Sequence, residues 1–275
     1  MQTPHRENRT AEHFLAPLVE VEELPCPIVS RASEYPSDFL IPPHRHRRAQ
    51  LVYASAGVMT VSTAAGLWVV PPQRAVWVPA LTTHHIHTAG RLSMRSLYIV
   101  PEAARQLPQT CCVVVVTPLL RELILYAMTL PPLYAPDSPA ERLMRVLLDQ
   151  LQQAPVAPLH VPMPTHEHLQ PIVRALTDNP ADGRRLEDWA RLVGVSSRTL
   201  ARDFHEETGI SFRHWRQQVR LLAALKRLAC QEQVTMVALE LGYDSPSAFI
   251  AMFKRALGVT PGQYFAGTSC AALPE

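Results

Sequence analysis

The sequence has little of what marks secreted or membrane-spanning proteins. It contains only 5 cysteines, an odd number, and Cys111 and Cys112 are adjacent, too close to bridge without strain. The apolar stretch LLRELILYAM contains Arg121 and Glu122, so no run approaches the ~20 residues of a spanning helix. The first residues, MQTPHRENRTAEHF, lack the apolar centre of a signal peptide. We therefore expect a cytoplasmic protein without a disulfide framework or a membrane partner.

An excess of charge of either sign is also lacking, with 26 Lys and Arg against 24 Asp and Glu. The balance is nevertheless uneven, since residues 184–265 hold 12 basic residues against 8 acidic ones. A basic excess indicates a polyanion partner, and a small one indicates specific contacts more than a blanket of charge. The length of 275 residues and the hydrophobic content of 47% fit two packed domains.

The chain divides into a part rich in strands and a part rich in helices. Residues 26–100 alternate β-branched runs with Pro and Gly, which is typical of an antiparallel barrel or sandwich. Two amphipathic helices follow within residues 117–153, with Thr117 and Ser138 as the expected N-caps. We predict an α+β protein of two domains, divided as follows: a segment over 1–24 for which disorder is one interpretation, a sheet domain over 25–155, a proline-rich linker over 156–166, and an all-α domain over 167–267.

The helical part repeats itself. Four landmarks recur 48 or 49 residues later, as Gly194 and Gly242, Phe204 and Phe253, Gly209 and Gly258, and Trp215 and Tyr264. In each copy a short apolar helix ends at the first glycine, and Ser196 or Ser245 is placed to cap a second helix. This is the pattern of a helix-turn-helix motif, whose second helix presents its N-terminal face to a DNA major groove. Two copies at a fixed separation indicate DNA binding far more strongly than one does.

The phase of each second helix separates core positions from outward positions. Leu200 and Phe204, and likewise Phe249 and Phe253, are four residues apart and are predicted to face inward. The intervening side chains can supply hydrogen bonds to guanine edges or phosphates. We expect DNA contacts from Ser197, Arg198, Thr199, Ala201, Arg202, His205, Ser247, Ile250, Lys254 and Arg255. Because the first set is the more polar, we expect it to dominate specificity.

The last hundred residues resemble the AraC/XylS family of bacterial transcriptional regulators, most clearly in VALELGYDSPSAFIAMFKRALGVTPGQYF. The resemblance implies that two recognition helices enter successive major grooves of operator DNA. It also implies that the sheet domain is a cupin-like β-barrel that senses an effector, and that the two following helices form a homodimer interface from Leu120, Leu123 and Ile124. Within the family the chain is most similar to the cupin-bearing subgroup that includes the regulator of nitroimidazole efflux. This similarity implies an efflux transporter gene as a target, with RNA polymerase as a partner if the protein is an activator.

A group of histidines marks the candidate effector site. The stretch HRHRRAQ places His44 and His46 on one face of a strand, with Gln50 four residues later, and His84 follows on a later strand. Cupin barrels, which this domain resembles, carry metal ligands at such positions. Gln50 offers a neutral amide where a carboxylate would add charge and affinity. The four residues therefore line a site for a divalent metal (nickel, zinc or iron) or, equally, for an organic effector.

Neighbouring histidines and aromatic residues are expected to have structural roles. Alternation along the strand predicts that His85 and His87 face away from the site and lie at the surface. Trp68 and Trp77 are expected to pack as walls of the barrel. The stretch CCVVVV reads as a buried strand, although a vicinal-thiol sensor is an alternative.

Three functions stay open at this stage. The leading one is a sequence-specific transcription factor controlled by a small molecule or metal. The second is a metal-dependent cupin enzyme with a helical appendage, and the third is an architectural DNA-binding protein without an effector. The duplicated motif argues against the enzyme, since catalysis does not require it. The effector, the operator sequence and the direction of regulation do not follow from the sequence.

Overall fold

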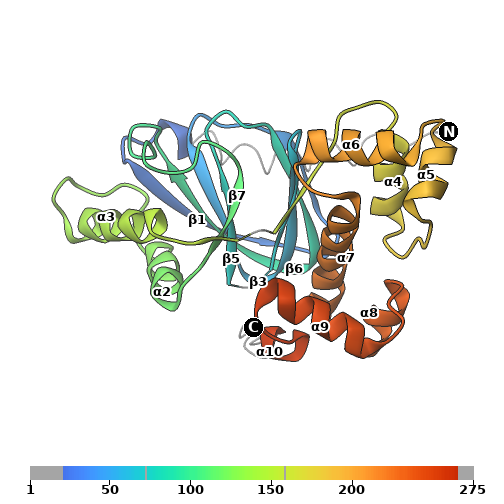
Figure 1. Cartoon of the computed structure of the whole chain (residues 1–275). Coiled ribbons are helices and arrows are strands. Elements are labelled where there is room, and N and C mark those ends of the chain that lie inside the picture. The colour runs from blue at the N-terminus through green and yellow to red at the C-terminus, as the bar shows by residue number, and fades with distance from the viewer. Residues whose placement is uncertain (1–20, 72, 158, 266–275) are drawn as a thin grey trace, which may run out of the picture. The chain divides into compact units, whose positions relative to one another are not determined.

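The computed structural model describes residues 21–71, 73–157 and 159–265, which form two compact units (Figure 1). The first unit holds the residues up to Thr63 and those from Val70 to Ala157. The second unit holds Ala64–Val69 together with the residues from Leu159 onward. Most of the N-terminal segment expected over residues 1–24 lies outside the described residues. None of the described helices combines the length and the apolar character needed to cross a bilayer.

The first unit is built on an antiparallel sheet, as the sequence predicts. Its strands are β1 (Ile28–Tyr35), β2 (Leu40–His44), β3 (Ala49–Thr63), β5 (Arg74–Val78), β6 (His84–Ile99), β7 (Cys112–Val115) and β8 (Val156–Ala157). They pair in the order β1, β6, β3, β5, β7, β8, and β2 also pairs with β6. The long strands β3 and β6 pair along most of their length, with register shifts between Ala54 and Val58. These two strands therefore position Gln50 and His84, two of the four residues of the predicted effector site.

Two helices, α2 (Pro118–Ala127) and α3 (Pro139–Gln152), lie together at one side of this sheet (Figure 1). Both predicted caps are confirmed, because the side chains of Thr117 and Ser138 accept hydrogen bonds from backbone N–H groups three residues on. Inward residues of the helices and the sheet form one hydrophobic cluster that includes Leu51, Tyr53, Trp77, Leu97, Leu120, Ile124, Met144 and Leu147. Burial of this apolar surface is the main force that holds the helices on the sheet.

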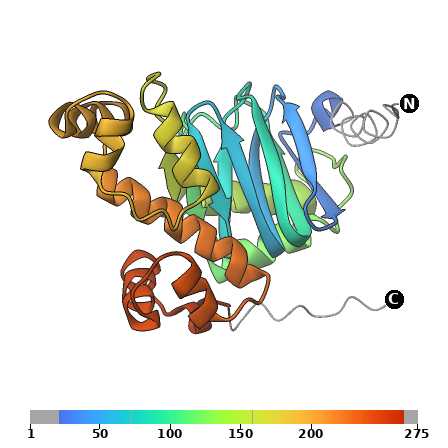
Figure 2. The ribbon, with the colours of Figure 1, turned by 90° about the vertical axis from the view of Figure 1, so that its right-hand side faces the viewer.

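The second unit is mostly helical. Its helices are α4 (Gln170–Asp178), α5 (Leu186–Leu192), α6 (Ser197–Thr208), α7 (Phe212–Ala229), α8 (Val234–Glu240), α9 (Pro246–Leu257) and α10 (Pro261–Phe265). The long helix α7 runs from the pair α5 and α6 to the pair α8 and α9 (Figure 2). Its buried face includes Trp215, Val219 and Leu225. The duplicated sequence pattern thus folds as two helix pairs joined by one helix.

The proline-rich segment expected as a linker contains short strands. Strand β8 pairs with β7, and β9 (His160–Pro162) pairs with β4 (Gly66–Val70). Trp68 is buried in β4, as a packing role requires, and the β4–β9 register sets it opposite His160. Their rings stack with centroids 5.7 Å apart. Nε1 of Trp215 donates a hydrogen bond to the carbonyl of Pro162 at 2.8 Å, which fastens β9 to α7.

Candidate functional site

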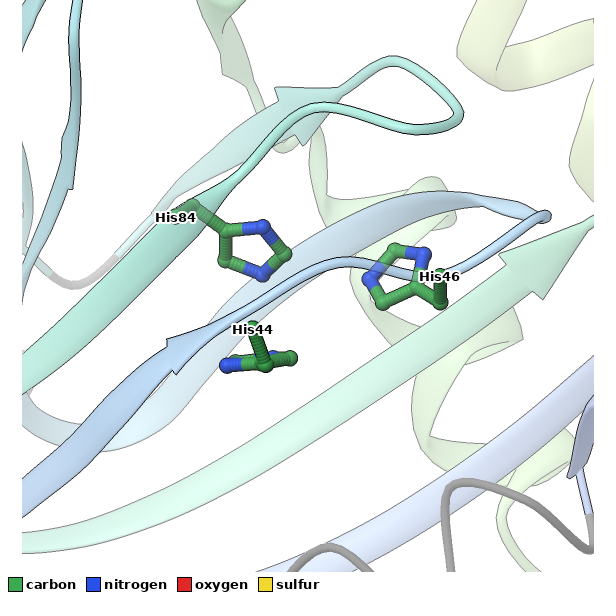
Figure 3. A group of neighbouring side chains, drawn as sticks. All are labelled: His44, His46 and His84. Carbon is green, nitrogen blue, oxygen red and sulfur yellow. The ribbon is translucent and has the colours of Figure 1, made fainter.

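Three imidazoles converge in the first unit (Figure 3). His44 ends β2 and pairs in register with His84 at the start of β6, while His46 follows in the connection to β3. One ring nitrogen from each residue lies within 4.8 Å of the other two. His46 and His84 are 4% and 1% exposed, whereas His44 is partly exposed. The cluster is therefore buried, with its most open side at His44.

Backbone carbonyls hold each of the three rings at Nδ1. The acceptors are Pro42 for His44 at 2.9 Å, Arg48 for His46 at 2.5 Å and Thr82 for His84 at 2.9 Å. Because a carbonyl oxygen only accepts hydrogen bonds, each Nδ1 carries the proton. In a neutral ring the lone pair of Nε2 is then free to bind a metal or to accept a hydrogen bond from a ligand.

The surroundings of His84 indicate whether the cluster suits a metal. Its Nε2 is buried without a hydrogen-bond partner among the described residues, and an unpaired buried polar atom is unfavourable unless a ligand completes it. Burial, and next the proximity of His44, lower the pKa of His84 to about 3. Burial likewise lowers the pKa of His44. Both rings are therefore neutral at physiological pH, so no proton has to leave them before a metal binds. The residues present fit a divalent transition metal.

Gln50 joins this cluster to a polar network on β6. One atom of its amide lies 3.1 Å from Nε2 of His46, and the other lies 3.0 Å from the hydroxyls of both Ser96 and Tyr98. The amide oxygen Oε1 of Gln50 is the atom beside His46, and the amide nitrogen Nε2 of Gln50 donates hydrogen bonds to the two hydroxyls. In this arrangement Gln50 orients His46.

Ser96 and Tyr98 belong to this network although the sequence did not predict them. The sequence feature that could have predicted them is their spacing of two residues on a strand, which places both side chains on one face. Tyr98 is the register partner of Gln50. The prediction for His85 and His87 is confirmed, because both are partly exposed and Nε2 of His87 lies 2.9 Å from the carboxylate of Asp38.

Two helix-turn-helix motifs occupy the second unit, formed by α5 with α6 and by α8 with α9. The predicted caps are confirmed, since Ser196 and Ser245 each accept a hydrogen bond from a backbone N–H three residues on. The turns contain Gly194 and Gly242 with φ angles of 73° and 74°. Other residue types are strained at such angles, so the glycines permit the sharp reversal between the two helices.

The outward faces of α6 and α9 carry the residues expected to contact DNA. Leu200 and Phe204 of α6, and Phe249 and Phe253 of α9, are fully buried, which confirms the predicted phase. Outside the buried core lie Ser197, Arg198, Thr199, Ala201, Arg202, His205, Ser247, Ile250, Lys254 and Arg255. Each motif therefore presents basic side chains to solvent from its second helix.

The chain's own core covers two of the three residues expected at a dimer interface. Leu120 and Ile124 are fully buried, and Leu123 packs against the same hydrophobic cluster of the first unit. The apolar face of α2 therefore packs into the chain's own core, which covers the side chains of Leu120 and Ile124. The outer face of α2 presents Leu119 and Tyr126 instead, which are 54% and 57% exposed.

Comparisons with known proteins cover both units. The family model of an AraC-like ligand binding domain matches residues 27–192, and that of a helix-turn-helix domain matches residues 189–267. The HTH-type transcriptional regulator NimR of Escherichia coli (strain K12) is 41% identical over 225 residues, which are 82% of each chain. The HTH-type transcriptional regulator RipA of Corynebacterium glutamicum is 36% identical over 106 residues, 38% of this chain and 32% of its own. The crystal structure of ToxT from Vibrio cholerae O395 aligns with 89% of this chain and 99% of its own, at 9% identity and a TM-score of 0.38.

Proposed function

Since this chain belongs to the AraC family of helix-turn-helix transcriptional regulators, we propose that a divalent transition metal at His44, His46 and His84 controls its binding to operator DNA. Family membership establishes a transcriptional regulator with a DNA-binding and a ligand-binding domain. The observation that supports a metal at this site is the convergence of three imidazoles, each held at Nδ1 by a hydrogen bond. Neutral imidazole nitrogens favour nickel, zinc or iron over magnesium and calcium, which prefer oxygen ligands.

The three ligands come from separate parts of the first unit. A bound metal would supply a cross-link between the end of β2, the connection to β3 and the start of β6. The chain's own residues prepare this link, because the carbonyls of Pro42, Arg48 and Thr82 hold the rings in place beforehand. Binding then favours the conformation in which the three segments meet, by the free energy of binding.

An organic effector is the second candidate for the same region. The hydrogen-bonded network of Gln50, Ser96 and Tyr98 favours it, because buried amide and hydroxyl groups fix the orientation of a polar small molecule. In this proposal His44, His46, Gln50 and His84 line the binding site without holding an ion. We expect no enzymatic activity in either case, because the relatives are transcriptional regulators.

Gel-shift titration of the chelator-treated protein tests the proposal. The DNA is taken from upstream of the protein's own gene and of the neighbouring genes, with and without nickel, zinc or iron(II). We expect one of these metals to change operator affinity at least about tenfold, which corresponds to ~1.4 kcal/mol of coupling. The double variant His44→Ala, His46→Ala should bind operator without responding. A metal response that persists in this variant contradicts the metal site, whereas a response only to an organic compound favours the second candidate.

We also propose that the protein acts as a homodimer joined through the outer faces of α2 and α3. Leu119, Tyr126 and Val146 are large apolar side chains that are 54%, 57% and 46% exposed there. The seven-residue spacing of Leu119 and Tyr126 places them on one face of α2. The resemblance to the regulator of nitroimidazole efflux supports an efflux transporter gene as the target and the cytoplasm as the location. RNA polymerase is the further partner if the protein activates transcription.

A further inference from the structure

A carboxylate stands beside an arginine on the first recognition helix, although DNA repels negative charge. Asp203 follows Arg202 in α6, and its side chain is only 15% exposed, against 62% for Arg202. An acidic group near the DNA phosphates lowers affinity unless cations of the protein neutralise it. The side chains that contact Asp203 therefore indicate its role.

Asp203 holds one edge of the Arg202 guanidinium. Its Oδ1 accepts hydrogen bonds from Nε at 3.1 Å and from Nη2 at 2.9 Å. A guanidinium has five N–H donors, so the end formed by Nη1 and the second N–H of Nη2 stays free. That end is the one that bonds to O6 and N7 of a guanine. The carboxylate thus fixes the side chain without occupying the edge that reads a base.

The second oxygen of Asp203 faces the segment that enters the DNA-reading unit. Nε2 of His168 lies 3.2 Å from Oδ2, and the histidine side chain is 18% exposed. The ring of His168 in turn lies 4.1 Å from that of His166, centroid to centroid. One carboxylate therefore contacts the reading arginine on one side and the incoming segment on the other.

The same segment is fastened to α6 and α7 at further points. Oε2 of Glu207 accepts hydrogen bonds from the backbone N–H of His166 at 3.0 Å and from Thr165 at 2.5 Å. Upstream, Pro162 accepts the hydrogen bond from Trp215 of α7. Residues 162–168 are thus held in place against the two helices. A displacement of this segment would move His168 and change the surroundings of Asp203.

We propose that Asp203 is a positioning residue that orients Arg202 for base readout, and that His168 links this orientation to residues 162–168. Without the carboxylate, Arg202 is free to turn toward phosphates, which it contacts in any sequence. The loss of one negative charge also favours DNA of any sequence. Discrimination between sequences therefore falls while non-specific affinity is kept or rises, a combination that damage to the fold does not produce. The proposal rests on the DNA-binding function of α6.

Competition binding to operator and scrambled duplexes tests the proposal on the full chain, once the native protein has been shown to discriminate between the two. We expect Asp203→Asn to lower discrimination about tenfold without weakening binding to scrambled DNA. His168→Ala should act in the same direction by about threefold, since it removes a neighbour of the carboxylate and leaves the carboxylate itself. In an Arg202→Ala background both substitutions should lose their effect on discrimination.

Glu206→Gln is the matched control, because it removes one negative charge from the same helix. Its carboxylate is 3.8 Å from Nε of Arg202, too far for a hydrogen bond. Equal losses of discrimination in Glu206→Gln and Asp203→Asn, or an undiminished effect of Asp203→Asn in the Arg202→Ala background, would overturn the positioning role. Full discrimination in His168→Ala would overturn the link to the segment. A native protein that does not discriminate at all would instead contradict DNA readout itself.

Discussion

The imidazole rings of His44 and His84 lie 4.3 Å apart, centroid to centroid, at the register position where β2 meets β6. Strand pairing, and not closeness in sequence, brings them together. Each ring is also fixed by a hydrogen bond to a carbonyl two residues earlier in the chain. The site is thus assembled by the fold before any ligand arrives, which reduces the entropy lost on binding.

We expect metal-replete protein to hold one divalent transition-metal ion per chain in elemental analysis. The double variant His44→Ala, His46→Ala should hold none, because a single imidazole retains an ion too weakly. His85→Ala is the control, since its side chain lies on the opposite face of the same strand. Stoichiometric metal in the double variant, or none in the native protein, would contradict the assignment.

Substitution of exposed cations should separate base readout from phosphate contact. We expect Arg198→Ala to weaken operator binding by about 1 to 3 kcal/mol and to relax specificity, because it lies at the N-terminal end of α6. Lys254→Ala, in the last turn of α9, should weaken binding to all sequences alike and reduce the salt dependence. Titrations with operator and scrambled DNA across a salt series check both. Unchanged discrimination in Arg198→Ala would exclude its role in readout.

Tyr126→Asp should convert the proposed dimer into a monomer, because it sets a charge in the exposed apolar face of α2. Leu239→Asp is the control, since Leu239 is 54% exposed on α8 of the second unit and the same charge is introduced there. Sedimentation equilibrium of the two variants and the native protein gives the answer. A dimer that survives Tyr126→Asp, or a native monomer, contradicts this interface.

The two helix-turn-helix glycines should differ in their tolerance of alanine. Gly194→Ala should cost about 1 to 2 kcal/mol of stability, since it strains the backbone at positive φ and a Cβ there meets nothing within 4 Å. Gly242→Ala should cost more, about 2 to 4 kcal/mol, because its Cβ would lie 2.9 Å from the carbonyl oxygen of Ala181. Calorimetric unfolding of both variants measures the difference. Equal costs would mean that the chain around Ala181 yields without penalty.

Alkylation of Cys111 by iodoacetamide should be slow at neutral pH and should accelerate with pH. Burial, and next the neighbouring Cys112, raise the pKa of the Cys111 thiol to about 11. A raised pKa leaves less of the reactive thiolate at pH 7, and this fraction grows about tenfold per pH unit until the pKa is reached. Labelling of Cys112→Ser, followed by peptide mass spectrometry, isolates the Cys111 thiol. Rapid labelling at pH 7 would favour the vicinal-thiol sensor.

Local chemistry accounts for what the sequence predicted correctly. Capping by Ser196 and Ser245, and the inward phase of Phe204 and Phe253, depend on residues a few positions apart. The apolar face of α2 was also visible, but its periodicity does not say whether the chain's own core or a partner covers it. Leu120 shows that the core does.

Contacts between distant segments are what the sequence did not reveal. The pairing of β4 with β9 and the approach of His168 to Asp203 depend on register and on the path of the chain. Short strands such as His160–Pro162 have no periodicity of their own, and proline suggests a loop. A neighbour across the fold, here Trp215, decides their conformation.

The grouping of Ala64–Val69 with the second unit bears on how the protein is made. During synthesis β4 leaves the ribosome well before its partner β9 and before α7, whose Trp215 fastens β9. The second unit therefore cannot be completed until β9 has been synthesised, although β4 is made much earlier. Contacts between segments so far apart in sequence slow folding. The helices that read DNA are therefore synthesised after β4, the strand with which β9 pairs.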